Sequence, residues 1–595
     1  MQETHRQIDE TNYNGDDTSN WTETEEGISQ YYIVFLSLLA VVMVLSKLMH
    51  DRPVLASFLP EAGMTIFVGI IAGCALDSFL PTEKPTGDDD YSQSELAARG
   101  LLTFSSNVFF TAFLPPIIFN SGFHLKSELF FRHFTPILLF ACLGTAISTV
   151  VVASLLKLVL HFNLSDSSFQ PHFSELLTFG ALISATDPVS TLAVFQQKRV
   201  DPQLFYLVFG ESVLNDAVGL VLFETFSKFV GQELSSERIV IACLNFLVDF
   251  TVSFLGSLAL GLASGVGAAL LFKFVDMRQI RVYELSLFIM IMYLPFFAAE
   301  ILQLSGIVTI LFTGMAAKHY AVPNLSEESR GEVDVLFRVT AHLAETAIFL
   351  ELGLSLFGIT SNGDVHSLFI LWAIAACLVG RAAHVYPITL GYNRRLSNGI
   401  GSLLANEGGN KPPTEILTNS RITANTSHML WFSGLRGAVA YACAKKFPNN
   451  FGNQTPFVIT TMVIVLVTVF FLGGTTELTL NALSIDMDVD EEKYLDLVEQ
   501  SVDADSGRIV AFDKQYISPY VIRDYTNDNL LPEKSKRNES FETVVTMEEY
   551  NKTHSVEMTA SGHRSNVRQM GVDLHRLGTG SSRRRSSIYD FGCQV

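Results

Sequence analysis

The sequence has little charge and few cysteines or tryptophans, and it lacks the short motifs that mark common enzymes. Charged residues make up 17% of the 595 residues, and there are six cysteines and three tryptophans. No GxSxG, HExxH or Walker motif occurs, and no histidines are paired at metal-binding spacing. These absences argue against serine hydrolases, zinc peptidases and P-loop enzymes. We therefore expect no enzyme activity and no catalytic residues.

The cysteines and the basic residues exclude two further classes. Five of the six cysteines lie in apolar stretches, where cysteine behaves as a small hydrophobic residue. No CxxC or Cys/His pair has metal spacing, so we expect neither a disulfide framework nor zinc. The cysteines are Cys74, Cys142, Cys243, Cys377, Cys443 and Cys593. The net charge is −20, and no basic patch is interleaved with aromatics, which excludes nucleic acid as an expected partner.

Long apolar stretches recur between Tyr31 and Leu480, and they end where the chain becomes densely charged after Asp486. A stretch of about 18 residues or more can cross the roughly 30 Å hydrocarbon layer as a helix. We count thirteen such stretches, at 31–48, 59–80, 107–123, 134–160, 174–197, 203–229, 243–275, 282–301, 303–320, 336–358, 366–391, 427–447 and 456–481. The sequence therefore predicts an all-α polytopic membrane protein with thirteen transmembrane helices, which interacts with membrane lipid.

Composition divides the chain into three parts. Residues 1–30 are an acidic tail without the basic region of a signal peptide. Residues 31–483 form the transmembrane domain, and 484–595 are predicted to be a largely disordered regulatory tail. Lysine and arginine are about twice as frequent in one alternate set of loops, which places the N-terminus outside the cytosol and the C-terminus inside it. A basic run before Ser586 and Ser587 suits a kinase as a partner.

Ionisable side chains deep in spanning helices cost several kcal/mol, so each is a functional hypothesis by default. Any one of them would fit a buried ion pair equally well, but several in one layer favour an ion path. The buried polar set comprises Asp187, Glu211, Asn215, Asp216, Glu345, Glu351, Arg381 and Arg436.

Two of the predicted spans contain a helix-breaking motif. Pro188 removes a backbone donor and should break its helix near Thr186. A Gly-Leu-Arg-Gly sequence at 434–437 weakens a second span, seven spans further on. Discontinuous helices place dipole ends at the bilayer centre, where Asp187 would suit a positive end and Arg436 a negative end. The spacing predicts two inverted six-helix repeats whose discontinuous helices cross.

Five motifs together resemble the sodium/proton exchangers of solute carrier family 9, and most closely the branch of the eighth mammalian isoform. They are Leu-Pro-Pro-Ile-Ile-Phe at 114–119, Ser-Ala-Thr-Asp-Pro-Val at 184–189, Phe-Gly-Glu-Ser-Val-Leu-Asn-Asp-Ala at 209–217, Gly-Arg-Ala-Ala at 380–383 and Trp-Phe-Ser-Gly-Leu-Arg-Gly-Ala at 431–438. The tail segment at 513–520 also resembles that branch. The resemblance implies a Golgi, endosomal or apical membrane and a homodimer with a moving core.

The resemblance also implies an ion site. Asp216 would be the carboxylate that binds Na+, with Asn215 orienting it. Thr186 would supply ligands at the helix break, and Asp187 would support the site. A single carboxylate binds either a cation or a proton, so competition for Asp216 is sufficient for exchange. Asn215 stands where electrogenic relatives carry a second aspartate, which implies electroneutral exchange.

Three more residues are implied to be structural charge partners. Glu211 and Arg381 resemble the buried pair that holds the ion-binding helix, and Arg436 would steady the helix crossing. Glu351 departs from the family pattern, which has an aromatic residue there, and it would contact water or lipid or add a cation site. The loop at 392–426 is also longer than in close relatives.

The resulting expectation is electroneutral antiport of sodium or potassium against protons by alternating access, which would regulate pH and cation content. No cofactor is expected beyond the transported ions. The alternative is a cation channel or a cation-binding membrane regulator. A channel usually carries rings of charge contributed by several subunits around a continuous pore, and the paired helix breaks favour the exchanger.

Overall fold

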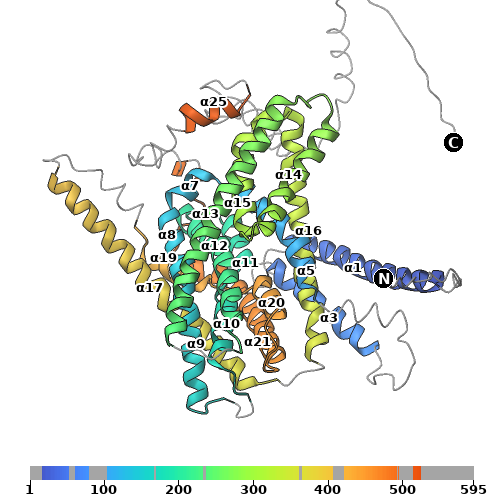
Figure 1. Ribbon diagram of the computed structural model, residues 1–595, viewed down its shortest axis with the longest axis vertical. Helices are drawn as coiled ribbons and strands as arrows, with labels where there is room; N and C mark the ends of the chain where they lie inside the picture. The colour runs from blue at the N-terminus through green and yellow to red at the C-terminus, as the bar shows by residue number, and fades with distance from the viewer. Residues whose placement is uncertain are drawn as a thin grey trace, which may run out of the picture. The chain divides into compact units, whose positions relative to one another are not determined.

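The computed structural model describes residues 17–51, 60–79, 104–165, 169–231, 236–360, 365–406, 421–491, 493–494 and 513–523. These residues form helices and contain no strand, and the helices can be followed in Figure 1. Each predicted span coincides with a helix or with consecutive helices. Nine of the described helical segments are long and apolar enough to cross a membrane. The others are shorter or more polar.

The helices pack into two bundles, and each bundle takes two separate parts of the chain. The first bundle contains α1 (Asp17–His50), α3 (Glu61–Phe79), α5 (Ser106–Val108), η1 (Phe109–Phe113), α6 (Leu114–His124), α13 (Ser236–Phe274), α14 (Arg281–Ile301), α15 (Gly306–Ala316), η3 (Ala317–Ala321), η4 (Val322–Asn324) and α16 (Glu327–Thr360). The chain enters this bundle, leaves it after α6 and returns at α13.

The second bundle holds four of the five motifs described above, at 184–189, 209–217, 380–383 and 431–438, and the two helix breaks. It contains α7 (Ser127–Arg132), α8 (Phe134–Leu138), η2 (Leu139–Gly144), α9 (Thr145–His161), α10 (Phe173–Ser184), α11 (Val189–Gln197), α12 (Pro202–Ser227), α17 (Ser367–Asn406), α19 (Ala424–Phe432), α20 (Ala438–Lys445), α21 (Gln454–Val467), η5 (Thr468–Gly473) and α22 (Thr476–Ala482). Along the chain the bundles alternate, since α1 to α6 and α13 to α16 form the first bundle and α7 to α12 and α17 to α22 form the second.

Backbones touch directly inside the first bundle. A Cβ atom added at Gly353 of α16 would lie 2.3 Å from the carbonyl oxygen of Ile66 in α3. One added at Gly122 of α6 would lie 2.3 Å from the carbonyl oxygen of Leu311 in α15. Small residues allow this approach, and van der Waals packing then replaces the hydrophobic driving force that a bilayer does not supply. At these two places the helices therefore have no long side chains between them.

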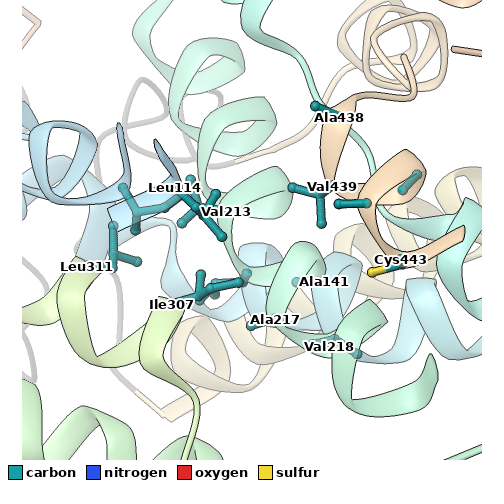
Figure 2. Close-up of a cluster of buried hydrophobic side chains, with 14 of the residues drawn as sticks. Leu114, Ala141, Val213, Ala217, Val218, Ile307, Leu311, Ala438, Val439 and Cys443 are labelled. Carbon is teal, nitrogen blue, oxygen red and sulfur yellow. The ribbon is translucent and has the colours of Figure 1, made fainter. Parts of the chain in front are cut away.

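Helix α12 lies where the two bundles meet. It contacts α15 on the side of the first bundle and α10 and α20 within the second. Figure 2 shows the apolar side chains of this region, with Leu114 and Ile307 near Val213 of α12, and Val439 and Cys443 on α20. Apolar side chains of α12 are buried on the sides of these neighbours, and its polar residues Ser212 and Asn215 contact the first helix break.

Two boundaries differ from the sequence-based expectation. Helix α1 begins at Asp17, so the predicted border between the acidic tail and the first span falls inside a helix. Helix α17 continues to Asn406, so much of the predicted loop at 392–426 is helical. At both places the helix continues from apolar into polar residues, because adding a residue to an existing helix costs less than starting a new one. Ser586 and Ser587 lie outside the described residues.

One piece of the predicted tail is packed against the first bundle. The η6 (Asp513–Ile517) and α25 (Ser518–Val521) helices lie at the end of α13. Lys273 Nζ donates to the carbonyl oxygens of Tyr520, at 2.8 Å, and Ile522, at 3.0 Å. Tyr320 and His319 bond the carboxylate of Asp513. The expectation of disorder therefore does not hold for this segment.

Candidate ion site

The first helix break separates α10 from α11. Helix α10 ends at Ser184 and α11 begins at Val189, with Pro188 between them. Proline supplies no backbone donor, so the helical hydrogen bonds cannot continue through this point. The carboxylate of Asp187 accepts a hydrogen bond from the backbone N–H of Val189 at 3.1 Å. Asp187 therefore caps the positive N-terminal end of α11.

The second break separates α19 from α20 and lies against the first. The backbone N–H of Asp187 donates to the carbonyl oxygen of Leu435 at 2.9 Å, so the two breaks cross. A Cβ atom at Gly437 would lie 2.0 Å from Oδ2 of Asp187. Only a residue without a side chain allows the carboxylate to approach the N-terminus of α20 so closely.

Arg436 occupies the opposite end of the first break. Its Nη1 donates to the carbonyl oxygens of Ser184, at 2.8 Å, and Ala185, at 3.1 Å. These carbonyls belong to the C-terminal end of α10, where the helix dipole is negative. The side chain is almost completely buried. The first break therefore has a negative side chain at the N-terminal end of α11 and a positive side chain at the C-terminal end of α10, and each complements the helix dipole there.

Helix α12 is tied to the first break by side chains on one of its faces. Nδ2 of Asn215 donates to Oγ1 of Thr186 at 2.6 Å, and Oδ1 of Asn215 accepts from the Thr186 backbone N–H at 3.3 Å. Ser212 donates to the Thr186 carbonyl oxygen at 2.5 Å. The hydrogen bonds of Asn215 therefore position Thr186, whereas the sequence-based expectation was that Asn215 would orient Asp216.

Asp216 is buried and faces a cavity. The residue is 8% exposed, and within the described part of the chain its carboxylate accepts no hydrogen bond. The cavity has a volume of about 350 Å³, and Asp187, Asp216 and Glu345 all line it. A buried carboxylate without donors is costly unless a cation or a proton occupies it. Glu345 lines the same cavity but is only partly buried, so the buried carboxylate of Asp216 is the stronger candidate to bind either ion.

The cavity reaches the protein surface at one end of the second bundle. Its lining extends from Asp216 past Phe205 to His124 at the end of α6 and to the exposed Gln196 near the end of α11. On α20 the lining includes Val439, and on α16 it stops at Phe349. Helices α16 and α20 continue beyond these residues toward the other end, where the bundles are in contact.

The predicted buried pair of Glu211 and Arg381 is present. The guanidinium donates to both carboxylate oxygens, with 2.9 Å between Nη2 and Oε2. Nη2 also donates to the carbonyl oxygen of Leu430 at 2.8 Å. The two side chains are 2% and 4% exposed. Because Glu211 precedes Asn215 by four residues on α12, the pair fixes the helix that carries the candidate site.

Glu345 and Ser212 were not predicted to be site residues. Glu345 belongs to the first bundle and lines the cavity opposite Asp216. The sequence identified it as a buried charge, but only the rotation and packing of α16 bring it to the cavity. Ser212 stands inside a recognised motif, one turn before Asp216, and the i, i+4 spacing could have identified it.

Crossed discontinuous helices around a buried carboxylate define the class of helical secondary transporters. The comparison with known proteins agrees. The chain resembles the sodium proton antiporter MjNhaP1 from Methanocaldococcus jannaschii, with a TM-score of 0.51, 15% identity, and coverage of 77% of this chain and 98% of that one. At this identity the likeness concerns the fold.

The family is shown by sequence. The profile of the family described as sodium/hydrogen exchanger, transmembrane, matches residues 34–482, and the chain belongs to this family of transporters. It is 39% identical to rat sodium/hydrogen exchanger 9 over 399 residues, which are 66% of this chain and 58% of that protein. It is 32% identical to human sodium/hydrogen exchanger 8, with 86% of each chain covered. The Arabidopsis thaliana exchanger 5 is 35% identical over 78% of this chain and 80% of its own length.

The family prediction and the resemblance to the branch of the eighth mammalian isoform are therefore confirmed. The matched region spans 58% to 64% of the length of the exchanger 9 proteins. The relatives that match it include both the eighth and the ninth exchangers.

Proposed function

We propose that the protein exchanges sodium or potassium for protons across a membrane by alternating access. The observation that carries the proposal is the carboxylate of Asp216, which is buried, faces a cavity and accepts no hydrogen bond from the described residues. Such a group needs a positive partner or a proton, and it can hold only one of the two at a time. Competition for this single site couples the two ions.

The neighbouring residues support this role. Asn215 and Ser212 hold Thr186 beside α12, and the Thr186 hydroxyl oxygen at the break is a suitable cation ligand. Asp187 is engaged with the N-termini of the half-helices, so we assign it a supporting role. Arg436 and the Glu211–Arg381 pair keep the crossing and α12 in place. A cation channel is disfavoured because Tyr441 and Ser355, which lie beyond the cavity lining on α20 and α16, are buried and in contact.

The finer features of the proposal concern topology and surroundings. We place thirteen helices across the membrane as two inverted repeats, with the N-terminus extracytosolic and the C-terminus cytosolic. In this orientation the cavity opens to the cytosol, since α6 ends and α12 begins at that side. Golgi, endosomal or apical membranes and a homodimeric assembly follow from the family resemblance. The first bundle would supply the fixed part and the second bundle the moving part.

The central test is Asp216→Asn in sealed vesicles with the purified protein. A sodium gradient should drive proton flux in the wild type and none in the variant, because the amide keeps the volume but cannot titrate. Asp249→Asn is the matched control, since Asp249 is an exposed carboxylate of α13 away from the cavity. Normal sodium-driven proton flux in Asp216→Asn would overturn the assignment.

Electroneutrality is a separate prediction. With one titrating carboxylate at the site, one cation enters as one proton leaves, so no net charge moves. Recordings on solid-supported membranes should show no sustained current after a sodium jump, and the exchange rate should not change with voltage. A steady current would show that a second group carries charge during transport.

A further inference from the structure

The two bundles are joined at the end opposite the cavity mouth by one buried and one partly buried polar contact. The hydroxyl oxygens of Tyr441 on α20 and Ser355 on α16 lie 3.1 Å apart. The hydroxyl of Ser106 on α5 donates to the carbonyl oxygen of Ala442 at 3.2 Å. The ring of Phe104 packs edge-on against that of Tyr441, with 4.9 Å between the centroids. Both hydrogen bonds cross from the first bundle to the second.

These contacts lie just beyond the cavity on the same helices. Val439 of α20 and Phe349 of α16 line the cavity, and Tyr441 and Ser355 follow them by two and six residues. At about 1.5 Å per residue, the contacts stand within roughly 10 Å of the lining. Tyr441 and Ser355 are completely buried. A path from Asp216 to this end of the protein therefore requires the two side chains to separate.

Glu351 lies beside these contacts on α16, four residues before Ser355 and so on the same helix face. It is 5% exposed, and its Oε1 accepts a hydrogen bond from the backbone N–H of Ser105 at 3.1 Å. Ser105 immediately precedes Ser106, whose hydroxyl reaches Ala442. The carboxylate thus fixes the start of the helix that carries one of the two bundle-to-bundle bonds.

We propose that Tyr441, Ser355 and Ser106 form a latch that closes this end of the protein while the cavity is open at the other, and that Glu351 is a positioning residue for the latch. The proposal rests on the proposed function, because a protein that transports by alternating access must open and close this end. Hydroxyl-to-hydroxyl and hydroxyl-to-carbonyl bonds suit the task. Each contributes little net free energy, so the latch can break in every cycle.

The test measures opening at this end without transport. Cys443 lies on the same face of α20 as the cavity-lining Val439, one turn further on, and is 2% exposed. In a full-length protein with Cys443 as its single cysteine, a membrane-impermeant methanethiosulfonate added from the closed side reports how often this end opens. Tyr441→Phe and Ser355→Ala should each raise the modification rate about 3- to 10-fold, the range that one net hydrogen bond supplies.

Two variants of Glu351 separate positioning from charge. Glu351→Gln keeps an oxygen that accepts from Ser105 and should label at the wild-type rate, whereas Glu351→Leu should label as fast as Ser355→Ala. Tyr293→Phe, on the partly exposed face of α14, is the control for loss of a tyrosine hydroxyl. The unfolding temperatures of all variants in detergent should match that of the wild type. A faster modification of Cys443 then reports opening at this end and not a loss of overall stability.

The outcomes are distinct. Wild-type labelling rates in both Tyr441→Phe and Ser355→Ala would overturn the latch. Equal acceleration in Glu351→Gln and Glu351→Leu would overturn the positioning role and show that the charge itself matters. If the wild type showed no exchange in vesicles, the proposed function would fail, while the labelling of Cys443 would still report whether these contacts hold the end closed.

Discussion

Replacing Arg381 by methionine removes one partner of an ion pair that lies deep in the second bundle. The guanidinium donates to both carboxylate oxygens of Glu211 and to the carbonyl oxygen of Leu430. The two charged side chains are 4% and 2% exposed, so water cannot take over these bonds. Loss of one partner of a buried pair costs about 3–5 kcal/mol, most of it from the stranded charge. We expect a loss of that size in the free energy of unfolding.

The assay is unfolding in mixed micelles with increasing denaturing detergent. The double variant Glu211→Gln with Arg381→Met should lose less free energy than Arg381→Met alone, because neither charge is then stranded. Arg395→Met on the same helix is the matched control. Arg395 is exposed, and its loss should change the free energy by no more than about 0.5 kcal/mol. Equal stabilities of the Arg381→Met and Arg395→Met variants would refute the reasoning.

Two other predictions concern the helix crossing and the docked tail segment. Gly437→Ala should lower the free energy of unfolding by about 1–3 kcal/mol or more, because the new Cβ would lie 2.0 Å from Oδ2 of Asp187. The control is Gly391→Ala, which has no atom within 4 Å of its Cβ and should be neutral or stabilising in the same assay. Equal effects of the two substitutions would contradict this prediction. Burial alone would raise the pKa of Asp513, but hydrogen bonds from His319 and Tyr320 outweigh burial and lower it. Because the pKa of Asp513 is lower in the docked segment than its value of about 3.9 in the free chain, the ionised carboxylate stabilises docking at pH values above about 3.9. This contribution is lost as the pH falls through the lowered pKa. Spin-label distances between α13 and the segment should therefore lengthen in acid, and Asp513→Asn should lengthen them at pH 7; unchanged distances would contradict the docking argument.

The sequence predicted those parts of the site that depend on local chemistry. Pro188 breaks any helix that contains it, so the end of α10 and the capping place of Asp187 follow from a few neighbouring residues. The place of Arg436 also follows from local chemistry, because a buried guanidinium in a helix break is stabilised by the carbonyl oxygens of a nearby helix C-terminus. The Glu211–Arg381 pair followed from the family resemblance and from the rule that buried charges find partners.

Other parts depend on packing that no local pattern encodes. Glu345 reaches the cavity only through the rotation of α16 against α12. Glu351 accepts a hydrogen bond from Ser105, which is 246 residues away in the chain. Nothing in the sequence around either residue indicates this contact. The docking of the tail segment uses Lys273 and backbone carbonyls. Carbonyls are present at every residue, so they leave no pattern in a sequence.

The backbone-to-backbone packing of the first bundle has a mechanical consequence. Long side chains between two helices act as a compliant layer, since rotamer changes absorb small shifts. At Gly353 and Gly122 there is no such layer, and an added Cβ atom would already lie 2.3 Å from a neighbouring carbonyl oxygen. These helix pairs can neither slide nor tilt without opening a void. In the exchange that we propose, the glycine-packed pairs α3–α16 and α6–α15 would therefore move as units, and the rearrangement would fall on the contacts of α12 with its neighbours.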